Sequence, residues 1–452
     1  TIGRNSVSSE ALGGTFLGRP VQIELAGAPE DQPDFQVIAR ARGSVDAQGL
    51  NEGLGLPVAG LVAGETDYVV DLLFPRGGND RPTPFTIRVG SELVGLEVGL
   101  PEPFMKPAAE AASLAVDIAF MPGGQRIESR GETDRGVSWN IAFTREGEAW
   151  DMERGTLSLG GGALEAAETR GLHIRGNVGS VRLDEWLRLS RGDEQRSGTA
   201  DRIRSIDVQV DSLRLLGQHL QDHRVRVDRS ARDWLVQFDG AQVKGSVFVP
   251  YDFGSERAVV LDMERLVLPG DDAAEASDAE REQIDPRTLP PITVKADEFA
   301  LGKRFLGAIE IQLARTDEGL VADSFVARDA SFDVVGNASW VADATDPTGY
   351  RSHLMATLTS RDVKATMRRL DYAPGIVSDD MSLLFDVTWS GGPRTDVFES
   401  LDGDVQVRFG AGRLDEIEPG AGRLFGLMSI VALPRRLSLD FTDVFDKGFG
   451  FD

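Results

Sequence analysis

The sequence predicts an all-β protein: an elongated, twisted antiparallel β-sheet with only a few short helices. Apolar and polar residues alternate in run after run, as at Val21, Ile23 and Leu25, which is the period of a strand with one apolar face. Turn-forming clusters separate these runs, in keeping with the 51 Gly and 21 Pro of the chain. Helical periodicity is confined to a few short segments.

Composition supports a folded chain and excludes several functions. Hydrophobic residues make up 41% and charged residues 27% of the 452 positions, close to ordinary globular usage. The formal charge of -25 repels phosphate backbones, so nucleic acid is not an expected partner. The absence of Cys excludes disulfides and thiolate metal sites.

Alternating runs continue through the first part of the chain, which we expect to form one β segment over 1–269. Residues 183–189 interrupt it with a predicted helical turn capped by Asp184. One of the later runs contains Trp234, Val236 and Phe238. The segment 270–291 is acidic, poor in large apolar residues and ends in prolines, which is the composition of a mobile loop.

The second part, 292–452, combines strands with two predicted helices. Near 360–371, Val363, Met367 and Leu370 are spaced i, i+4 and i+7 on one side of a helix. Near 421–433 the same kind of stripe recurs before Pro434 ends the helix. Its residues are Leu424, Leu427, Met428 and Val431, with Phe425 and Ile430 lying off the stripe.

Strands flank this second helix, and a basic pair follows it. The pair Arg435 and Arg436 either complements the negative end of the helix dipole or contacts a phosphate. The flanking runs have their apolar residues at alternate positions. They are Leu383, Phe385, Val387 and Trp389, then Val405, Val407 and Phe409, and finally Leu437, Leu439 and Phe441.

Summed over the chain, the runs predict about 20 to 25 strands, more than one ordinary sheet holds. Two arrangements accommodate them. The apolar faces either pack against each other in several β-sandwiches, or they line a groove in one long coiled sheet. Stacked at about 4.8 Å, about 20 strands would extend on the order of 95 Å. Composition alone does not separate the two arrangements.

The last third of the chain resembles the YhdP branch of the AsmA-like envelope proteins, a repeating β-groove family. The resemblance lies in PGAGRLFGLMSIVALPRRLSLDFTDVFDKGFGFD at 419–452, and upstream in DPRTLPPITVKADEFALG, GNASW, SRDVKATMRRLDY and DVTWSGGP. It implies a groove-shaped sheet that crosses the periplasm and carries phospholipid between the inner and outer membranes. It also implies an N-terminal anchoring helix in the inner membrane, which is not within this sequence.

On this resemblance, one side of the strands binds phospholipid acyl chains, and the helix near 421–433 lies at the groove or at a membrane. The expected groove residues are Trp234, Val236, Phe238, Leu383, Phe385, Val387, Trp389, Val405, Val407, Phe409, Leu437, Leu439 and Phe441. No cofactor is expected.

Catalysis and metal binding have little support in the sequence. His219 and His223 are four positions apart, but no carboxylate stands at ligand spacing beside them, and we interpret them as solvated loop residues. No nucleophile elbow or phosphate-binding loop occurs. Two alternatives to a lipid conduit remain: a structural or adhesive array of β-domains, and an enzyme acting on envelope polysaccharide.

Overall fold

The computed structural model describes most of the chain. The described residues are 9–28, 32–56, 58–77, 83–147, 149–162, 164, 167–183, 185–186, 202–215, 218–252, 256–268, 285–373, 376–392, 400–414 and 450–451. The chain divides into two compact units. Unit 1 comprises Thr1–Leu215 and Gln221–Arg229, and unit 2 comprises Leu216–Leu220 and Ser230–Asp452.

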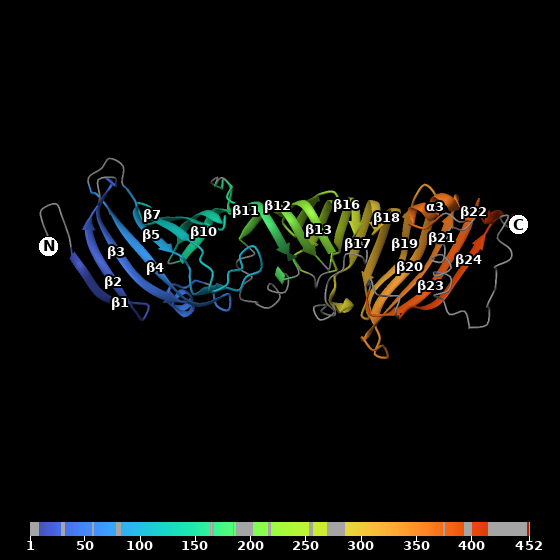
Figure 1. The fold of residues 1–452 in the computed structure, drawn as a ribbon, viewed down its shortest axis with the longest axis horizontal. Coiled ribbons are helices and arrows are strands. Elements are labelled where there is room, and N and C mark those ends of the chain that lie inside the picture. The colour runs from blue at the N-terminus through green and yellow to red at the C-terminus, as the bar shows by residue number, and fades with distance from the viewer. Residues whose placement is uncertain are drawn as a thin grey trace. The chain divides into compact units, whose positions relative to one another are not determined.

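Unit 1 is a sheet in which nearly every strand pairs with the next one in the chain (Figure 1). Along the sheet the order is β1-β2-β3-β4-β5-β7-β8-β9-β10-β11-β12, while β6 pairs with the first residues of β4. The bounds are β1 Ser9–Phe16, β2 Arg19–Gly27, β3 Phe35–Asp46, the single π-turn η1 Gly49–Gly53, β4 Val62–Pro75, β5 Phe85–Ser91, β6 Leu96–Val98, β7 Leu114–Phe120, β8 Arg126–Thr133, β9 Ser138–Glu146, β10 Ala149–Leu159, β11 Gly171–Arg182 and β12 Ile203–Leu215; β13, Gln218–Arg229, spans the unit boundary.

Unit 2 repeats this arrangement in the order β14-β15-β16-β17-β18-β19-β20-β21-β23-β24. Strands β22, β25 and β26 form a separate small sheet. The bounds are β14 Asp233–Asp239, β15 Val243–Pro250, β16 Val259–Leu268, the 3-10 turn η5 Pro286–Thr288, β17 Ile292–Leu301, β18 Arg304–Arg315, β19 Gly319–Arg328, β20 Phe332–Ala342, β21 Tyr350–Ser360, α3 Val363–Arg369, β22 Ile376–Ser378, β23 Met381–Ser390, β24 Asp402–Phe409, β25 Gly412–Leu414 and β26 Gly450–Phe451.

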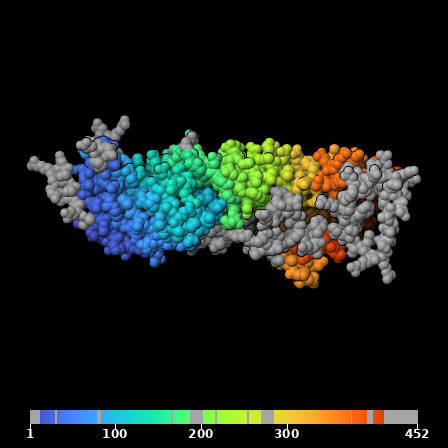
Figure 2. Space-filling view, viewed as in Figure 1, coloured from blue at the N-terminus to red at the C-terminus, as the bar shows by residue number. Residues whose placement is uncertain are grey.

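The structure confirms the all-β fold class. Within each unit the colours of the space-filling view pass across the molecule in chain order (Figure 2), because neighbouring strands are mostly neighbours in sequence. Among the strand pairs that the structure describes in full, three are parallel where the sequence predicted antiparallel strands: β10 with β11, β11 with β12, and β16 with β17. Parallel neighbours need a long return connection. The segments between these strands are longer than hairpin turns. Their length indicated a loop, but it did not show whether the two strands run parallel or antiparallel.

The helix predicted near 360–371 is present as α3. Asp362 caps it by accepting a hydrogen bond from the Ala365 backbone N–H at 2.9 Å. One side of α3 is buried in a core cluster at the end of the unit 2 sheet. The Arg369 guanidinium lies 4.4 Å from the centre of the Phe305 ring and 3.3 Å from the Asp329 carboxylate. The buried cluster comprises Phe332, Leu358, Val363, Met367, Ile376 and Met381.

The other predicted interruptions are described in part. At the predicted turn over 183–189, Leu183, Glu185 and Trp186 are helical, and the remaining residues lie outside the described part. Of the acidic segment 270–291, residues 285–291 are described and contain η5, capped by the Asp285 side chain. Strands β16 and β17, on either side of this segment, pair with each other inside unit 2. The two compact units divide within β13, and the division of the chain at 270–291 stays a prediction.

The core cluster gives a first prediction. Phe332 is fully buried, whereas Val335 on the same strand is 53% exposed on the opposite face. Phe332→Ala is expected to lower the free energy of unfolding by about 3 to 5 kcal/mol, because it leaves a cavity. Val335→Ala should change it by less than about 0.5 kcal/mol. Urea unfolding of both variants measures the difference, and equal losses would contradict the assignment of the core to this end of the sheet.

Candidate functional site

Two rows of apolar residues cross the entire sheet of unit 2. Directly paired residues on neighbouring strands point to the same face, so a chain of cross-strand pairs defines one face. The first row is Val236, Val247, Leu261, Val294, Ile311, Phe325, Gly336, Ala356, Phe385 and Val405. The second is Phe238, Gly245, Met263, Ala296, Ile309, Ala327, Val334, Leu358, Leu383 and Val407. Neither row contains a polar residue.

The residues predicted for the groove in β14, β23 and β24 all lie on this one face. Trp234 pairs with Val249 two positions from the first row, and Trp389 pairs with Ser352 on the same parity as Phe385. Asp386 and Thr388 lie on the opposite face, as the alternation predicted. The structure therefore brings together residues from three strands that are up to 175 positions apart in the sequence, from Trp234 to Phe409.

Unit 1 has an equivalent apolar face, which the predicted site residues did not include. Its longest row crosses all the consecutively paired strands. The row is Leu12, Ile23, Ala41, Val70, Val89, Val116, Gly131, Trp139, Leu157, Ile174 and Ile206. The alternating runs of these strands indicated one apolar face for each strand. Alternation does not show the register between strands, so it could not show that these faces align in one row.

Two of the three glycines in these rows do not interrupt them, because aromatic rings from the next strand cover them. A Cβ on Gly336 would collide with the Phe325 ring, and one on Gly131 would collide with the Trp139 ring. The Trp139 indole N–H also donates to Ser129 Oγ at 3.1 Å, which satisfies a hydroxyl on the same face. The apolar surface is therefore continuous across both glycines.

The opposite face of unit 1 carries charge in place of apolar side chains. A cross-strand row there alternates in sign over six strands, and it includes the ion pairs Arg40–Asp71 at 2.6 Å and Arg88–Asp117 at 2.9 Å. The arginine of each pair is exposed to solvent, which screens the interaction and limits what it adds to stability. The row is Glu24, Arg40, Asp71, Arg88, Asp117 and Arg130, which we call the charge row.

The first apolar row of unit 2 is only partly buried. Nine of the ten residues in the first row of unit 2 are neither fully buried nor fully exposed, and only Ala356 is buried. Of the described elements, α3, η5 and β22 lie against the sheet of unit 2, and β22 does so through Ile376 in the core cluster. A closed sandwich core would bury such residues fully. Water or a ligand can therefore reach much of this face.

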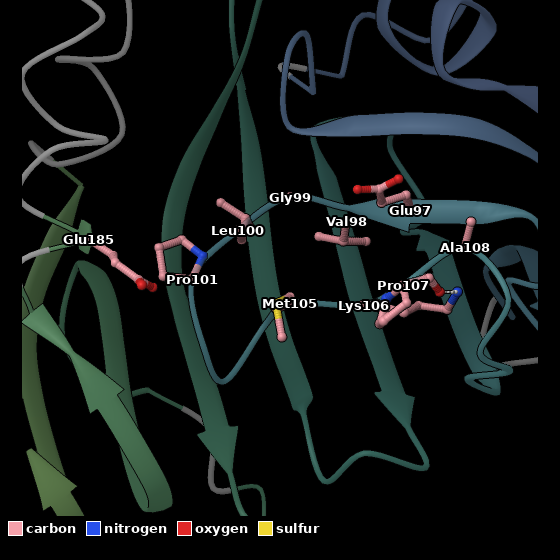
Figure 3. Close-up of a pocket in the computed structure, with 10 residues that line it drawn as sticks. All are labelled: Glu97, Val98, Gly99, Leu100, Pro101, Met105, Lys106, Pro107, Ala108 and Glu185. Atoms are coloured by element: carbon pink, nitrogen blue, oxygen red, sulfur yellow. Dashed lines mark hydrogen bonds between the residues drawn. The ribbon is translucent and has the colours of Figure 1, made fainter. Parts of the chain in front are cut away.

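A pocket of about 670 Å³ lies beside β6 in unit 1 (Figure 3). The segment after β6 doubles back, so that Val98 and Lys106 exchange backbone hydrogen bonds of 2.8 and 3.0 Å. The Trp186 indole N–H donates to the Glu102 carbonyl at 3.1 Å and its ring meets Phe104 edge-on. The lining is Glu97, Val98, Gly99, Leu100, Pro101, Met105, Lys106, Pro107, Ala108 and Glu185.

Lys106 holds the doubled-back segment together. It is 3% exposed, and its ammonium donates to the carbonyls of Leu96 at 2.7 Å and Pro107 at 3.1 Å. Burial lowers the pKa of this ammonium below its usual range, because the charged form has lost its water. Its donors are directed at the protein backbone, so the residue is structural.

Several predicted residues lie outside the described part of the chain. They are the helix residues Leu424, Phe425, Leu427, Met428, Ile430 and Val431, the basic pair Arg435 and Arg436, and the strand residues Leu437, Leu439 and Phe441. Their roles stay predictions.

The two histidines that are four positions apart lie on a strand. Contrary to the loop interpretation, His219 and His223 belong to β13, and His223 is fully buried. Among the described residues no group of three His, Cys, Asp or Glu side chains could hold a metal ion. In the same part of the chain, none of the helices has the length and apolarity to cross a bilayer.

Fold and site together define a class of protein: open β-sheets whose strands pair in chain order, with one continuous, accessible apolar face. The chain belongs to the YhdP family, since the family model described as "YhdP protein" matches residues 3–452. It is 21% identical over 458 residues to the intermembrane phospholipid transporter YhdP of Escherichia coli strain K12. That alignment covers 99% of this chain and 35% of the relative. No solved structure matches the chain.

The half-buried face gives a second prediction. Phe385→Asp should cost about 1.5 to 3 kcal/mol, roughly the transfer free energy of the lost ring, because water can solvate the new carboxylate. Leu358→Asp is the matched control on the neighbouring strand, where the side chain is 4% exposed. It should cost more than about 4 kcal/mol. Urea unfolding measures both, and equal costs would indicate that Phe385 is part of a closed core.

Proposed function

We propose that this chain is a segment of a passive hydrophobic conduit that carries phospholipid across the periplasm between the inner and outer membranes. The observation that carries the proposal is the pair of unbroken apolar rows in unit 2, the first of them largely half-buried, and their counterpart in unit 1. Membership of the YhdP family and the name of the E. coli relative support it. In this proposal the conduit is held to the inner membrane.

The physical basis of transport is the uniformity of the face. Burying acyl chains is worth about 0.8 kcal/mol per CH₂ group. A lipid that moves from one strand to the next along an apolar row exchanges equivalent contacts, so it does not return that area to water. The polar head group stays solvated outside the apolar face. Such transport requires neither a cofactor nor a catalytic residue, and we propose that the chain is not an enzyme.

The test is the parity of lipid contact. A photo-crosslinking amino acid at Phe385 should label bound phospholipid, whereas one at Asp386 should not, because successive strand residues face opposite sides. The full chain would be irradiated after incubation with vesicles of phosphatidylethanolamine and phosphatidylglycerol, and mass spectrometry would measure the adduct at each position.

A second pair, at Val405 and Asp404 on β24, repeats the comparison one strand away. Equal labelling at both parities in the two pairs would reject lipid binding to the apolar face. Absence of labelling at all four positions would favour an array of β-domains without a lipid channel.

A further inference from the structure

An arginine-lined pocket occupies one edge of the unit 1 sheet. Strands β10, β11 and β12 are parallel, so their first residues meet at the same edge. A pocket of about 310 Å³ lies there. Four arginines against two acids form most of its lining, in a chain whose overall charge is -25. The lining is Asp151, Met152, Glu153, Arg170, Gly171, Arg202, Ile203, Arg204 and Arg229.

Two of the arginines, Arg170 and Arg202, make only long ion pairs with the acids that the structure describes. Arg170 lies 3.8 Å from Glu146, which is outside the lining. Glu153 is paired with Arg126 at 3.0 Å, outside the lining. Asp151 is shared by Arg170 at 3.8 Å and Arg202 at 3.7 Å. Both distances exceed the 2.7 to about 2.9 Å of a charge-assisted hydrogen bond. The two guanidinium groups are also 72% and 52% exposed, so an incoming anion can approach them.

The apolar face of unit 1 leads directly to this pocket. An apolar cross-strand row runs along the same edge and ends at Met152, which lines the pocket. Ile203, on the other side of the lining, pairs with Leu172 on the apolar face. The Phe85 ring stacks between those of Phe74 and Phe120, with centroids 5.3 and 5.6 Å away. The row is Phe85, Phe120, Ile127, Phe143 and Met152.

The position of a third lining arginine, Arg204, is set by the backbone around it. Arg204 is the extra residue where the β11–β12 register shifts between Leu172 and His173. Its Nη1 donates to the Arg229 carbonyl at 2.8 Å, and a Cβ on Gly171 would collide with its side chain. Arg204 is thus held at the pocket wall, while Arg170 and Arg202 extend from the first positions before β11 and β12.

We propose that this pocket is a phosphate site for the head group of a phospholipid whose acyl chains lie on the adjoining apolar row. Guanidinium groups bind phosphate oxygens through paired N–H donors, and the aromatic row supplies the apolar contact beside them. The proposal rests on the proposed conduit for the source of the ligand. The pocket would hold lipids at one defined point of an otherwise uniform face.

The test compares two soluble lipids that differ only in the head group. Dihexanoyl-phosphatidylglycerol carries the phosphodiester, and dihexanoylglycerol has the same chains without it. Binding of each to the full chain would be measured by calorimetry for the wild type and for Arg170→Gln/Arg202→Gln. The control is Arg40→Gln/Arg88→Gln, which removes the same charge from the charge row on the opposite face.

We expect Arg170→Gln/Arg202→Gln to weaken phosphatidylglycerol binding by about 10-fold or more, as expected for lost charge-assisted hydrogen bonds. Dihexanoylglycerol binding should be unchanged, and the control should stay within about 2-fold of wild type for both lipids. The melting temperature of Arg170→Gln/Arg202→Gln should equal that of the wild type, because both substituted side chains are exposed.

The remaining outcomes separate this site from the conduit. If the substituted protein binds both lipids like the wild type, the phosphate site is rejected and the conduit stands. If wild type binds neither lipid, the conduit is rejected. A titration with inorganic phosphate then shows whether the pocket binds phosphate at all. Phosphate binding that the substitutions abolish would then identify a free-phosphate site and overturn the lipid source. Absence of phosphate binding would overturn both.

Discussion

Cross-strand pairing is the constraint on which the molecule depends, because a residue and its partner must point to the same face. Ten strands in unit 2 keep their apolar residues aligned through nine successive pairings. Bulges preserve the alignment where the alternation changes phase. In β19, Leu320 and Ala322 precede a register shift and Phe325 and Ala327 follow it, yet all four pair with apolar-face residues of β20. A bulge is thus how this sequence corrects an odd spacing.

Alternation predicted which residues of β14, β23 and β24 share a face, because the period of a strand is a local property. Helix α3 was predictable for the same reason, since Asp362 and the stripe beginning at Val363 lie within one short segment. The parallel pairs and the arginine pocket were not. Arg126, Arg170 and Arg202 are far apart in the sequence, and only the direction and register of β8 and β10–β12 bring them to one edge.

The two faces of each sheet separate the tasks of binding and solubility. The apolar face offers rows without a polar group, so it has no preferred position for an acyl chain except where an edge supplies charge. The opposite face carries exposed acidic side chains such as Asp262 and Glu310 in unit 2. A surface of this kind stays hydrated and repels anionic bilayers, which leaves a single face suited to lipid.

The charge row has a consequence for assembly of the sheet. A strand that slips by two residues keeps its apolar side chains on the correct face, so hydrophobic burial alone cannot distinguish the slipped pairing from the native one. Charge can. A slip of β8 against β7 by two residues would move Asp117 from Arg130 to Glu128 in one direction and to Glu132 in the other. Like charges directly opposite each other are destabilising. The exposed face, which contacts no lipid in our proposal, therefore favours the native register during folding. Its charges disfavour the slipped pairings that bury the same apolar residues.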